Sequence, residues 1–270
     1  MQEESTIKAL AMFAHPDDIE FSCAGTLAML HSRGVETHYL TLANGCCGSM
    51  VEDREQTARR RWNENLSAAK VLGAVAHPPL FDDLDIFYGR ESAQRVSAVV
   101  RRIRPDIILT HAVEDYMEDH METARLALHA AFTASMPNYV TEPSVPPVAG
   151  SCALYHALPH GLRSPRDGTR AYPSFYIDIS EALSLKREAL ACHESQKLWL
   201  DQTQGMDAYL EEMERMALEQ GSDTGCFKFA EGFTRHSSLG LSAESYRPLE
   251  EVLAGALWLN KNYPQSPRGS

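Results

Sequence analysis

The sequence predicts an α/β fold in which helices cover a mostly parallel β-sheet. Short apolar segments at 7–13, 35–42 and 106–111 have the length and composition of buried strands. Longer segments of helical composition separate them. In such a β-α-β order the strands run parallel, and the loops at their carboxyl ends form the ligand crevice. The length of 270 residues is sufficient for one large core, so we expect a single domain over 1–270.

Glycine and proline bound the expected elements. Pro16 fixes its own φ and disfavours helix at His15, so the chain is expected to turn directly after the first strand. Gly34 and Gly73 are suited to the residue just after a helix, where positive φ is common. The helices expected in this half of the chain lie at 22–33, 52–72, 91–103 and 118–135.

The second half is less regular. Seven prolines fall between 137 and 173, which predicts a long ordered loop that covers the site. A late strand follows at 175–179, and Ser180 is expected to cap a helix that runs to about His193. The remaining expected elements are helices at 206–220 and 248–259 and a frayed tail at 264–270.

Composition excludes several classes of protein. The net charge is −12 and the pI is about 5.4, which disfavours nucleic acid and anionic membrane surfaces as partners. The polar, acidic start is unlike a signal peptide, and no apolar run is long enough to span a bilayer. The six cysteines show no CxxC spacing. We therefore expect a cytoplasmic protein with a small-molecule substrate, and the sequence leaves a homo-oligomer open.

The segment 14–23 carries the strongest chemical signal. It places His15, Asp17 and Asp18 on one tight turn after the first strand. Adjacent carboxylates repel each other and are costly to desolvate, so their presence at a strand end indicates a cation. His and Asp three positions apart can both ligate Zn²⁺, which leaves the other Asp free to take a proton. The alternative, that the two aspartates only cap the next helix, needs one carboxylate and no histidine.

A second polar segment, 115–120, follows the strand at 106–111 and so lies at the same edge of the sheet. His120 would supply the third protein ligand of a catalytic zinc site. Asp119 beside it would orient a ligand or the substrate. Taken alone, His120 is more typical of a surface histidine at a helix start, and the pairing with the first turn favours the metal.

Together these motifs resemble the LmbE-like (PIG-L) deacetylase family. The resemblance rests on the Ala-His-Pro-Asp-Asp run at 14–18 and the Asp-His pair at 119–120. It extends over about 7–236, through the loop at 41–48, the Arg-x-x-Glu helix from Arg61 with Leu-Gly at 72–73, and late segments at 186–196 and 230–233. It implies a Rossmann-like three-layer sandwich with the active site at the carboxyl ends of the strands.

The resemblance also implies an activity, the metal-dependent hydrolysis of an N-acyl group, usually N-acetyl, on an amino sugar or its glycoconjugate. The zinc ligands would be His15, Asp18 and His120, and another divalent metal is compatible with this donor set. Asp17 would be the general base. Arg61 and Asp83 would contact the sugar, although three aspartates (82, 83 and 85) crowd one loop and Arg61 could equally be a solvated helix residue.

One position departs from the family pattern. Met117 stands where many members carry the first histidine of His-x-Asp-His, and methionine has no N–H donor for an oxyanion. Three explanations stay open: another group has taken the role, zinc alone suffices, or the chain only binds sugar. The candidate groups are His156, His160, His236 and Tyr116, of which His236 is the first choice. The alternative functions are a sugar-binding protein that retains the metal and a hydrolase of another small amide.

Overall fold

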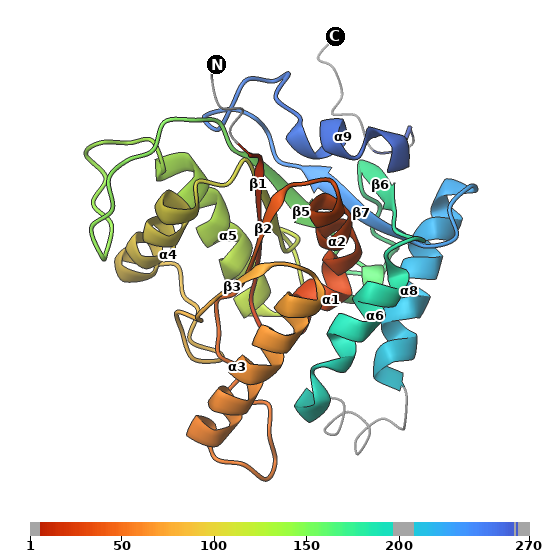
Figure 1. Ribbon diagram of the computed structural model, residues 1–270, viewed down its shortest axis with the longest axis horizontal. Coiled ribbons are helices and arrows are strands. Elements are labelled where there is room, and N and C mark those ends of the chain that lie inside the picture. Colours follow the sequence, from red (N-terminus) through yellow and green to blue (C-terminus); the bar gives the residue numbers. More distant parts are fainter. Residues whose placement is uncertain (1–5, 197–207, 262, 264–270) are drawn as a thin grey trace.

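A computed structural model describes residues 6–196, 208–261 and 263. The described chain forms three layers, with one mixed sheet between two layers of helices. Figure 1 shows α4 and α5 on one side of the sheet and α2, α3 and α6 on the other. The predicted three-layer α/β architecture is confirmed.

The strands are β1 (Lys8–Phe13), β2 (Glu36–Thr41), β3 (Val75–His77), β4 (Ile107–Thr110), β5 (Ala153–Ala157), β6 (Phe175–Asp178), β7 (Ala230–Arg235) and β8 (Leu257–Leu259). The helices are α1 (Asp18–Ser22), α2 (Ala24–Ser32), α3 (Arg54–Val71), α4 (Arg90–Ile103), α5 (Glu118–Thr133), α6 (Leu183–Ala191), α8 (Ala208–Thr224) and α9 (Pro248–Val252). Two short 3₁₀ turns, η1 (His160–Leu162) and η2 (Ala254–Ala256), complete the described elements.

Five strands form the parallel part of the sheet, in the order β3-β2-β1-β4-β5. β1 lies at its centre. Its side chains alternate between the two faces of the sheet, and both sets are buried because helices cover both faces. Ala11 and Phe13 join the core on the α2 face, whereas Leu10 and Met12 join the core that contains residues of α4 and α5. Since these strands are parallel, the segments after β1, β2, β3, β4 and β5 all begin at one edge of the sheet. That edge carries the candidate site.

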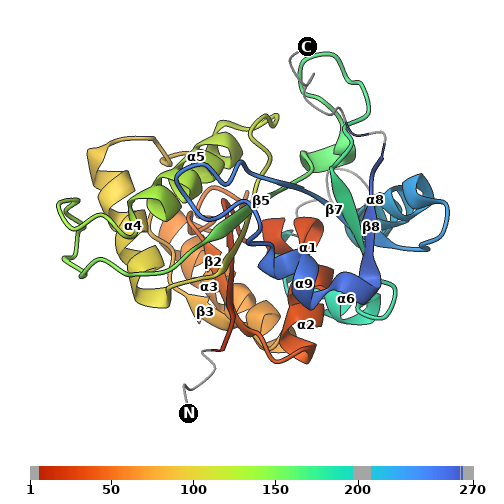
Figure 2. The same cartoon turned by 90° about the horizontal axis from the view of Figure 1, so that it is seen from above.

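The other three strands extend the sheet with antiparallel pairing, in the order β5-β7-β6-β8. Figure 2 shows β7 and β8 on the same side of the molecule as α8. The sheet is therefore parallel in its first half and antiparallel in its second, which the alternation of strands and helices did not indicate.

The segment 137–173 is not one continuous loop. It contains β5, whose five residues are all buried between β4 and β7. The seven prolines of this segment lie outside β5, so they bound the strand and do not interrupt it. The segment also brings His160 of η1 to the site edge, so the prediction that it shapes the site applies to that portion.

Two other local predictions are wrong. The helix expected at 248–259 ends at Val252. The last three residues of that expected range, Leu257–Leu259, form edge strand β8. Ser180 does not cap a helix: its hydroxyl donates to Asp178 Oδ1, and α6 begins three residues later, after Ala182. The helix expected at 206–220 is observed as α8, although its first two residues and the expected frayed tail at 264–270 lie outside the described residues.

A buried carboxylate joins the two halves of the chain. Glu231 of β7 accepts hydrogen bonds from the backbone N–H groups of Gly25 and Thr26, at 2.9 and 2.7 Å. These groups belong to the first turn of α2, which has no side-chain cap of its own. Lys186 of α6 donates to the same carboxylate at 2.6 Å, so the buried charge is paired. No helix in the described part of the chain is both long and apolar enough to cross a bilayer.

Candidate active site

The turn after β1 is built from mutual contacts between backbone and side chains. The backbone N–H of His15 donates to Asp18 Oδ2 at 2.7 Å, and the N–H of Asp18 donates to the His15 carbonyl at 3.2 Å. Asp17 between them has a φ of 98°, in the left-handed region that few non-glycine residues adopt. Strain of this kind is tolerated where the surroundings hold the residue in place, commonly at functional sites.

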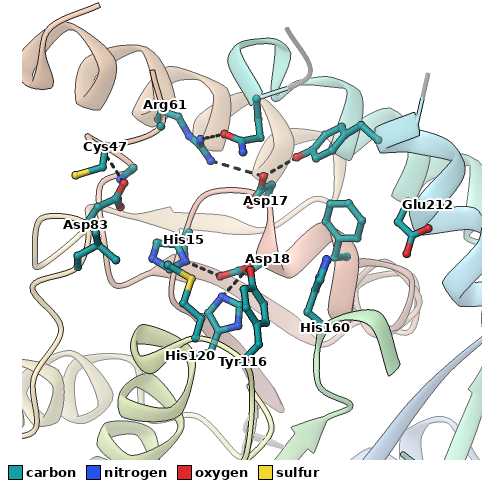
Figure 3. Close-up of a pocket in the computed structure, with 17 residues that line it drawn as sticks. His15, Asp17, Asp18, Cys47, Arg61, Asp83, Tyr116, His120, His160 and Glu212 are labelled. Carbon is teal, nitrogen blue, oxygen red and sulfur yellow. Dashed lines mark hydrogen bonds and ion pairs between the residues drawn. The ribbon is translucent and has the colours of Figure 1, made fainter. Parts of the chain in front are cut away.

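His15, Asp18 and His120 come together at this edge of the sheet. One ligand atom of each residue lies within 4.8 Å of the others. His15 Nδ1 is 3.4 Å from Asp18 Oδ2, and His120 Nε2 is 3.5 Å from Asp18 Oδ1. Figure 3 shows both rings directed at the Asp18 carboxylate. The turn after β1 and the start of α5 therefore supply one cluster, as the sequence predicts.

The other nitrogen of each ring faces a carboxylate. His15 Nε2 lies 2.9 Å from Asp119 Oδ2, and His120 Nδ1 lies 3.1 Å from Asp115 Oδ1. A histidine that donates its outer N–H to a carboxylate keeps the lone pair of its inner nitrogen for a metal. The predicted supporting position of Asp119 agrees with this contact, and Asp115, to which sequence reasoning gave no role, lies at ion-pair distance from His120.

The charges of the cluster suit a cation. Burial alone would raise the pKa of Asp18, but nearby His120 and His111 hold it well below its usual range. Burial lowers the pKa of His15, yet its hydrogen bonds to Asp119 and Asp18 outweigh this and raise the pKa to about 10. The donor set of two imidazoles and one carboxylate, with their second nitrogens paired, fits a zinc-type ion.

Asp17 does not belong to this cluster and is held from the opposite side. The Tyr209 hydroxyl of α8 donates to Asp17 Oδ2 at 2.6 Å, and Arg61 Nη2 lies 3.7 Å from the same oxygen. Burial raises the pKa of Asp17, and the Arg61 charge opposes this rise. Figure 3 shows Asp17 and Asp18 with different partners, so one aspartate is available for a cation and the other for a proton.

Arg61 is buried and is not a solvated helix residue. Its guanidinium donates to the Pro16 carbonyl and to the Gln196 side chain. The loop after β2 packs closely against it: a Cβ on Gly48 would lie 2.7 Å from Arg61 Nη1, and one on Gly45, where φ is +75°, would lie 2.9 Å from Nε. Glycine at these two positions lets the backbone approach the guanidinium.

Asp83 lines the pocket, but its carboxylate is already engaged with the protein. Its two oxygens accept the backbone N–H groups of Gly45 and Cys47, each at 2.9 Å. Asp82 contacts side chains instead: it pairs with Arg54 at 3.0 Å and accepts a hydrogen bond from the Asn44 amide. Of the crowded aspartates, Asp83 is thus the one that fixes the loop after β2 at the mouth of the pocket.

The pocket has a volume of about 500 Å³ and contains the predicted ligands and base. Tyr116, Met117, His160 and Tyr209 also line it. Sequence reasoning missed Tyr209, because no local pattern connects a tyrosine of α8 with a turn 192 residues earlier.

The structure separates the four groups that could replace the family histidine at Met117. Tyr116 and His160 line the pocket, with ring centroids 5.8 Å apart, and the Tyr116 ring lies 5.4 Å from that of His120. His156 and His236 do not line it. They contact each other, with Nε2 of His156 3.0 Å from Nδ1 of His236, and His236 lines a different hollow. The position of His236 therefore gives no support to its selection as a catalytic residue.

Two further groups among the described residues bring three metal-ligating atoms within 4.8 Å. One contains His111, Asp115 and His120. His111 Nε2 accepts the backbone N–H of Ala14 at 2.9 Å, so this nitrogen's lone pair is occupied. The other group, Cys46, Cys47 and Asp83, shares no residue with the His15 cluster.

Comparisons with known proteins give one family match and several similar deacetylases. Residues 10–131 match the family model described as PIG-L, GlcNAc-PI de-N-acetylase. The chain is 28% identical over 195 residues to diacetylchitobiose deacetylase of Thermococcus kodakarensis, covering 70% of each protein. It is also similar in structure to N,N'-diacetylchitobiose deacetylase of Pyrococcus horikoshii, with a TM-score of 0.72, 23% identity, and coverage of 89% of this chain and 88% of the other.

One relative of comparable similarity has a different activity. The 4-oxalmesaconate hydratase of Pseudomonas putida is 26% identical over 202 residues, which is 71% of this chain and 75% of that protein. Relatives of this chain therefore include proteins with two different activities.

Proposed function

Since the chain belongs to the PIG-L (LmbE-like) family, we propose that it is a metal-dependent N-deacetylase of an amino sugar or its glycoconjugate. The observation that carries the proposal is that the two neighbouring aspartates, Asp17 and Asp18, contact different groups. Asp18 faces three imidazoles, those of His15, His111 and His120, and Asp17 faces a phenol and a guanidinium. Amide hydrolysis with water needs both an electrophile and a proton carrier, and this turn supplies a place for each.

The metal would be held by His15, Asp18 and His120, and zinc is the ion that best suits this donor set. A bound divalent ion lowers the pKa of water and polarises a carbonyl oxygen. Asp119 and Asp115 would keep the two rings in the orientation and tautomer that ligation requires.

Asp17 is the proposed general base and acid. Its carboxylate would take one proton from the attacking water, whose oxygen forms the new bond to the acyl carbon. The C–N bond then breaks, and Asp17 would return the proton to the departing amine, giving acetate and the free amino sugar. Its raised pKa suits a group that must both accept and donate within one turnover. Arg61 and Tyr209 position it.

For the oxyanion we propose Tyr116 in place of the family histidine. Of the pocket groups considered, its ring is the one packed against His120, whereas His160 lies one ring further out. A phenol has an ordinary pKa of about 10, so the Tyr116 hydroxyl keeps at neutral pH the proton that an oxyanion donor needs. Arg61 and Asp83 remain proposed contacts at the pocket wall, Arg61 through its charge and Asp83 by shaping the loop at 45–48.

A hydratase is the second candidate because one relative with that activity matches most of the chain. The same base and metal could direct water to a double bond. The pocket favours the deacetylase, since Asp17, Asp83 and Glu212 line it together with a single arginine, Arg61, and this excess of carboxylates disfavours an anionic substrate such as a carboxylic acid.

A substrate panel tests the proposal. Purified protein loaded with zinc is incubated with N-acetylated mono- and disaccharides, an inositol-linked N-acetylglucosamine, and unsaturated carboxylates, and products are identified by mass spectrometry. We expect loss of an acetyl group from at least one sugar and a Tyr116→Phe rate that is lower by roughly tenfold or more. Gain of water by a carboxylate, with every sugar unchanged, would establish the hydratase. Sugar binding without cleavage by a fully metallated protein would establish the binding function.

A further inference from the structure

The loop after β2 carries two adjacent cysteines that the deacetylase reaction does not use. Cys46 is buried and Cys47 is exposed, and their sulfur atoms lie 4.0 Å apart. Asp83 lies beside both: one ligand atom of each of the three residues is within 4.8 Å of the others. We propose that Cys46, Cys47 and Asp83 form a second metal site, for a thiophilic divalent cation such as Zn²⁺ or Cd²⁺, at the mouth of the pocket. This proposal does not depend on the proposed function.

The spacing of the sulfur atoms matches shared coordination. Two thiolates bound to one tetrahedral Zn²⁺ at a Zn–S distance of about 2.3 Å have sulfurs about 3.8 Å apart. The observed 4.0 Å is close to this value and about twice the length of a disulfide bond. The two thiols are therefore arranged to hold one ion between them without a large movement of the loop.

The loop is held in this arrangement by the third proposed ligand. Asp83 accepts the N–H groups of Gly45 and Cys47, and the N–H of Cys46 donates to the Asn44 side chain at 3.0 Å. A carboxylate that accepts one hydrogen bond on each oxygen still has lone pairs for a cation. Figure 3 shows Cys47 and Asp83 together, on the opposite side of the pocket from His160 and Glu212.

The local charge is compatible with a cation. Asp82 and Asp83 both accept hydrogen bonds from residues of the loop, and Arg54 is paired with Asp82. The second nearby cation, the buried Arg61, packs against Gly45 and Gly48 of the loop. Arg54 also donates to Cys47 Sγ at 3.3 Å, and its exposed side chain can keep Asp82 when the sulfur binds a metal. Each thiol loses its proton to the solvent as its sulfur–metal bond forms, so binding weakens at low pH.

Cadmium titration tests the site, because a thiolate bound to Cd²⁺ gives an ultraviolet charge-transfer absorbance that histidine and aspartate ligands do not. The reduced full-length protein, with one equivalent of Zn²⁺ already added, is titrated with Cd²⁺. We expect saturation at one Cd²⁺ per chain. The Cys46→Ser/Cys47→Ser double variant should lose the absorbance, and the matched Cys192→Ser/Cys226→Ser variant should keep it. Retention in the first variant or loss in the second overturns the proposal.

Two measurements keep the proposal testable if the double variant fails to fold. In the wild-type protein, Zn²⁺ beyond the first equivalent should slow alkylation of exposed Cys47 while that of exposed Cys226 is unchanged, as followed by peptide mass spectrometry. Asp83→Asn should weaken the Cd²⁺ affinity by roughly tenfold or more. Alkylation of Cys47 that Zn²⁺ does not slow, or slows no more than that of Cys226, contradicts the three-ligand site. An unchanged Cd²⁺ affinity in Asp83→Asn contradicts it as well.

Discussion

Two sets of histidines near the same edge of the sheet differ in what their second ring nitrogen contacts. In the carboxylate-paired set, His15 and His120 each place one nitrogen against an aspartate and the other toward Asp18. In the His156–His236 pair, the rings contact each other, and the second nitrogen of His156 lies 2.7 Å from the carbonyl of His111.

This difference shifts the pKa values of His156 and His15 in opposite directions. His156 Nδ1 donates to the carbonyl, so its Nε2 must accept from His236, and a proton added there would meet another donor. Burial and the neighbouring His236 lower the pKa of His156 to about 4, although the carbonyl opposes the shift. His15, with comparable burial, has its pKa raised to about 10. A histidine becomes a cation site through its carboxylate partners, and proximity to other histidines is insufficient.

Loss of the base should have the largest effect on activity. Asp17→Asn keeps the size of the side chain and removes the proton acceptor, so we expect kcat to fall by roughly a hundredfold or more while the metal stays bound. Steady-state rates on an accepted sugar and elemental analysis of the same sample check this. A near-normal kcat would mean that Asp17 serves only the turn.

Removal of a ligand should strongly reduce metal binding. His120→Ala leaves His15 and Asp18 without the third donor, so protein purified without chelator should contain much less zinc than wild type. Asp119→Asn should weaken metal affinity by about 10- to 100-fold, since it removes the carboxylate that orients His15. Full occupancy of His120→Ala in elemental analysis would contradict the ligand assignment.

The His156–His236 pair should instead affect stability in acid. In the unfolded chain His156 is protonated below about pH 6.5, whereas in the folded protein it is protonated only below about pH 4. The free energy of unfolding therefore falls as the pH is lowered from 6.5 to 4. The contribution is on the order of 3 kcal/mol at most. His156→Gln should therefore show a shallower loss of stability between pH 6.5 and 4 in urea titrations. Equal slopes for the two proteins would contradict the low pKa.

The smallest effect is expected at His236. Because its ring lies against His156 and lines a hollow separate from the pocket, His236→Ala should leave kcat within about twofold of wild type. Tyr116→Phe provides the contrasting variant in the same assay. A large loss of rate in His236→Ala together with an unchanged rate in Tyr116→Phe would reverse the comparison.

The sequence predicts the parts of the site that follow strongly apolar strands. His15, Asp18 and His120 lie directly after β1 or at the start of α5, so strand order alone brings them to one edge. Short strands were missed where the signal is weak: β3 has three residues, and β5 lies in a proline-rich segment. The Tyr209 contact and the pairing of His236 depend on packing between distant segments, which local patterns do not contain.

The contacts of Glu231 and Tyr209 also set a temporal order. A ribosome delivers the proposed ligands and base within the first 120 residues, but the acceptor for the α2 N–H groups and the hydroxyl that holds Asp17 come from residues 231 and 209. A nascent chain stalled near residue 200 therefore carries every proposed ligand and the base but lacks the contacts made by Glu231 and Tyr209. Activity should appear only late in synthesis, when the last strands have joined the sheet.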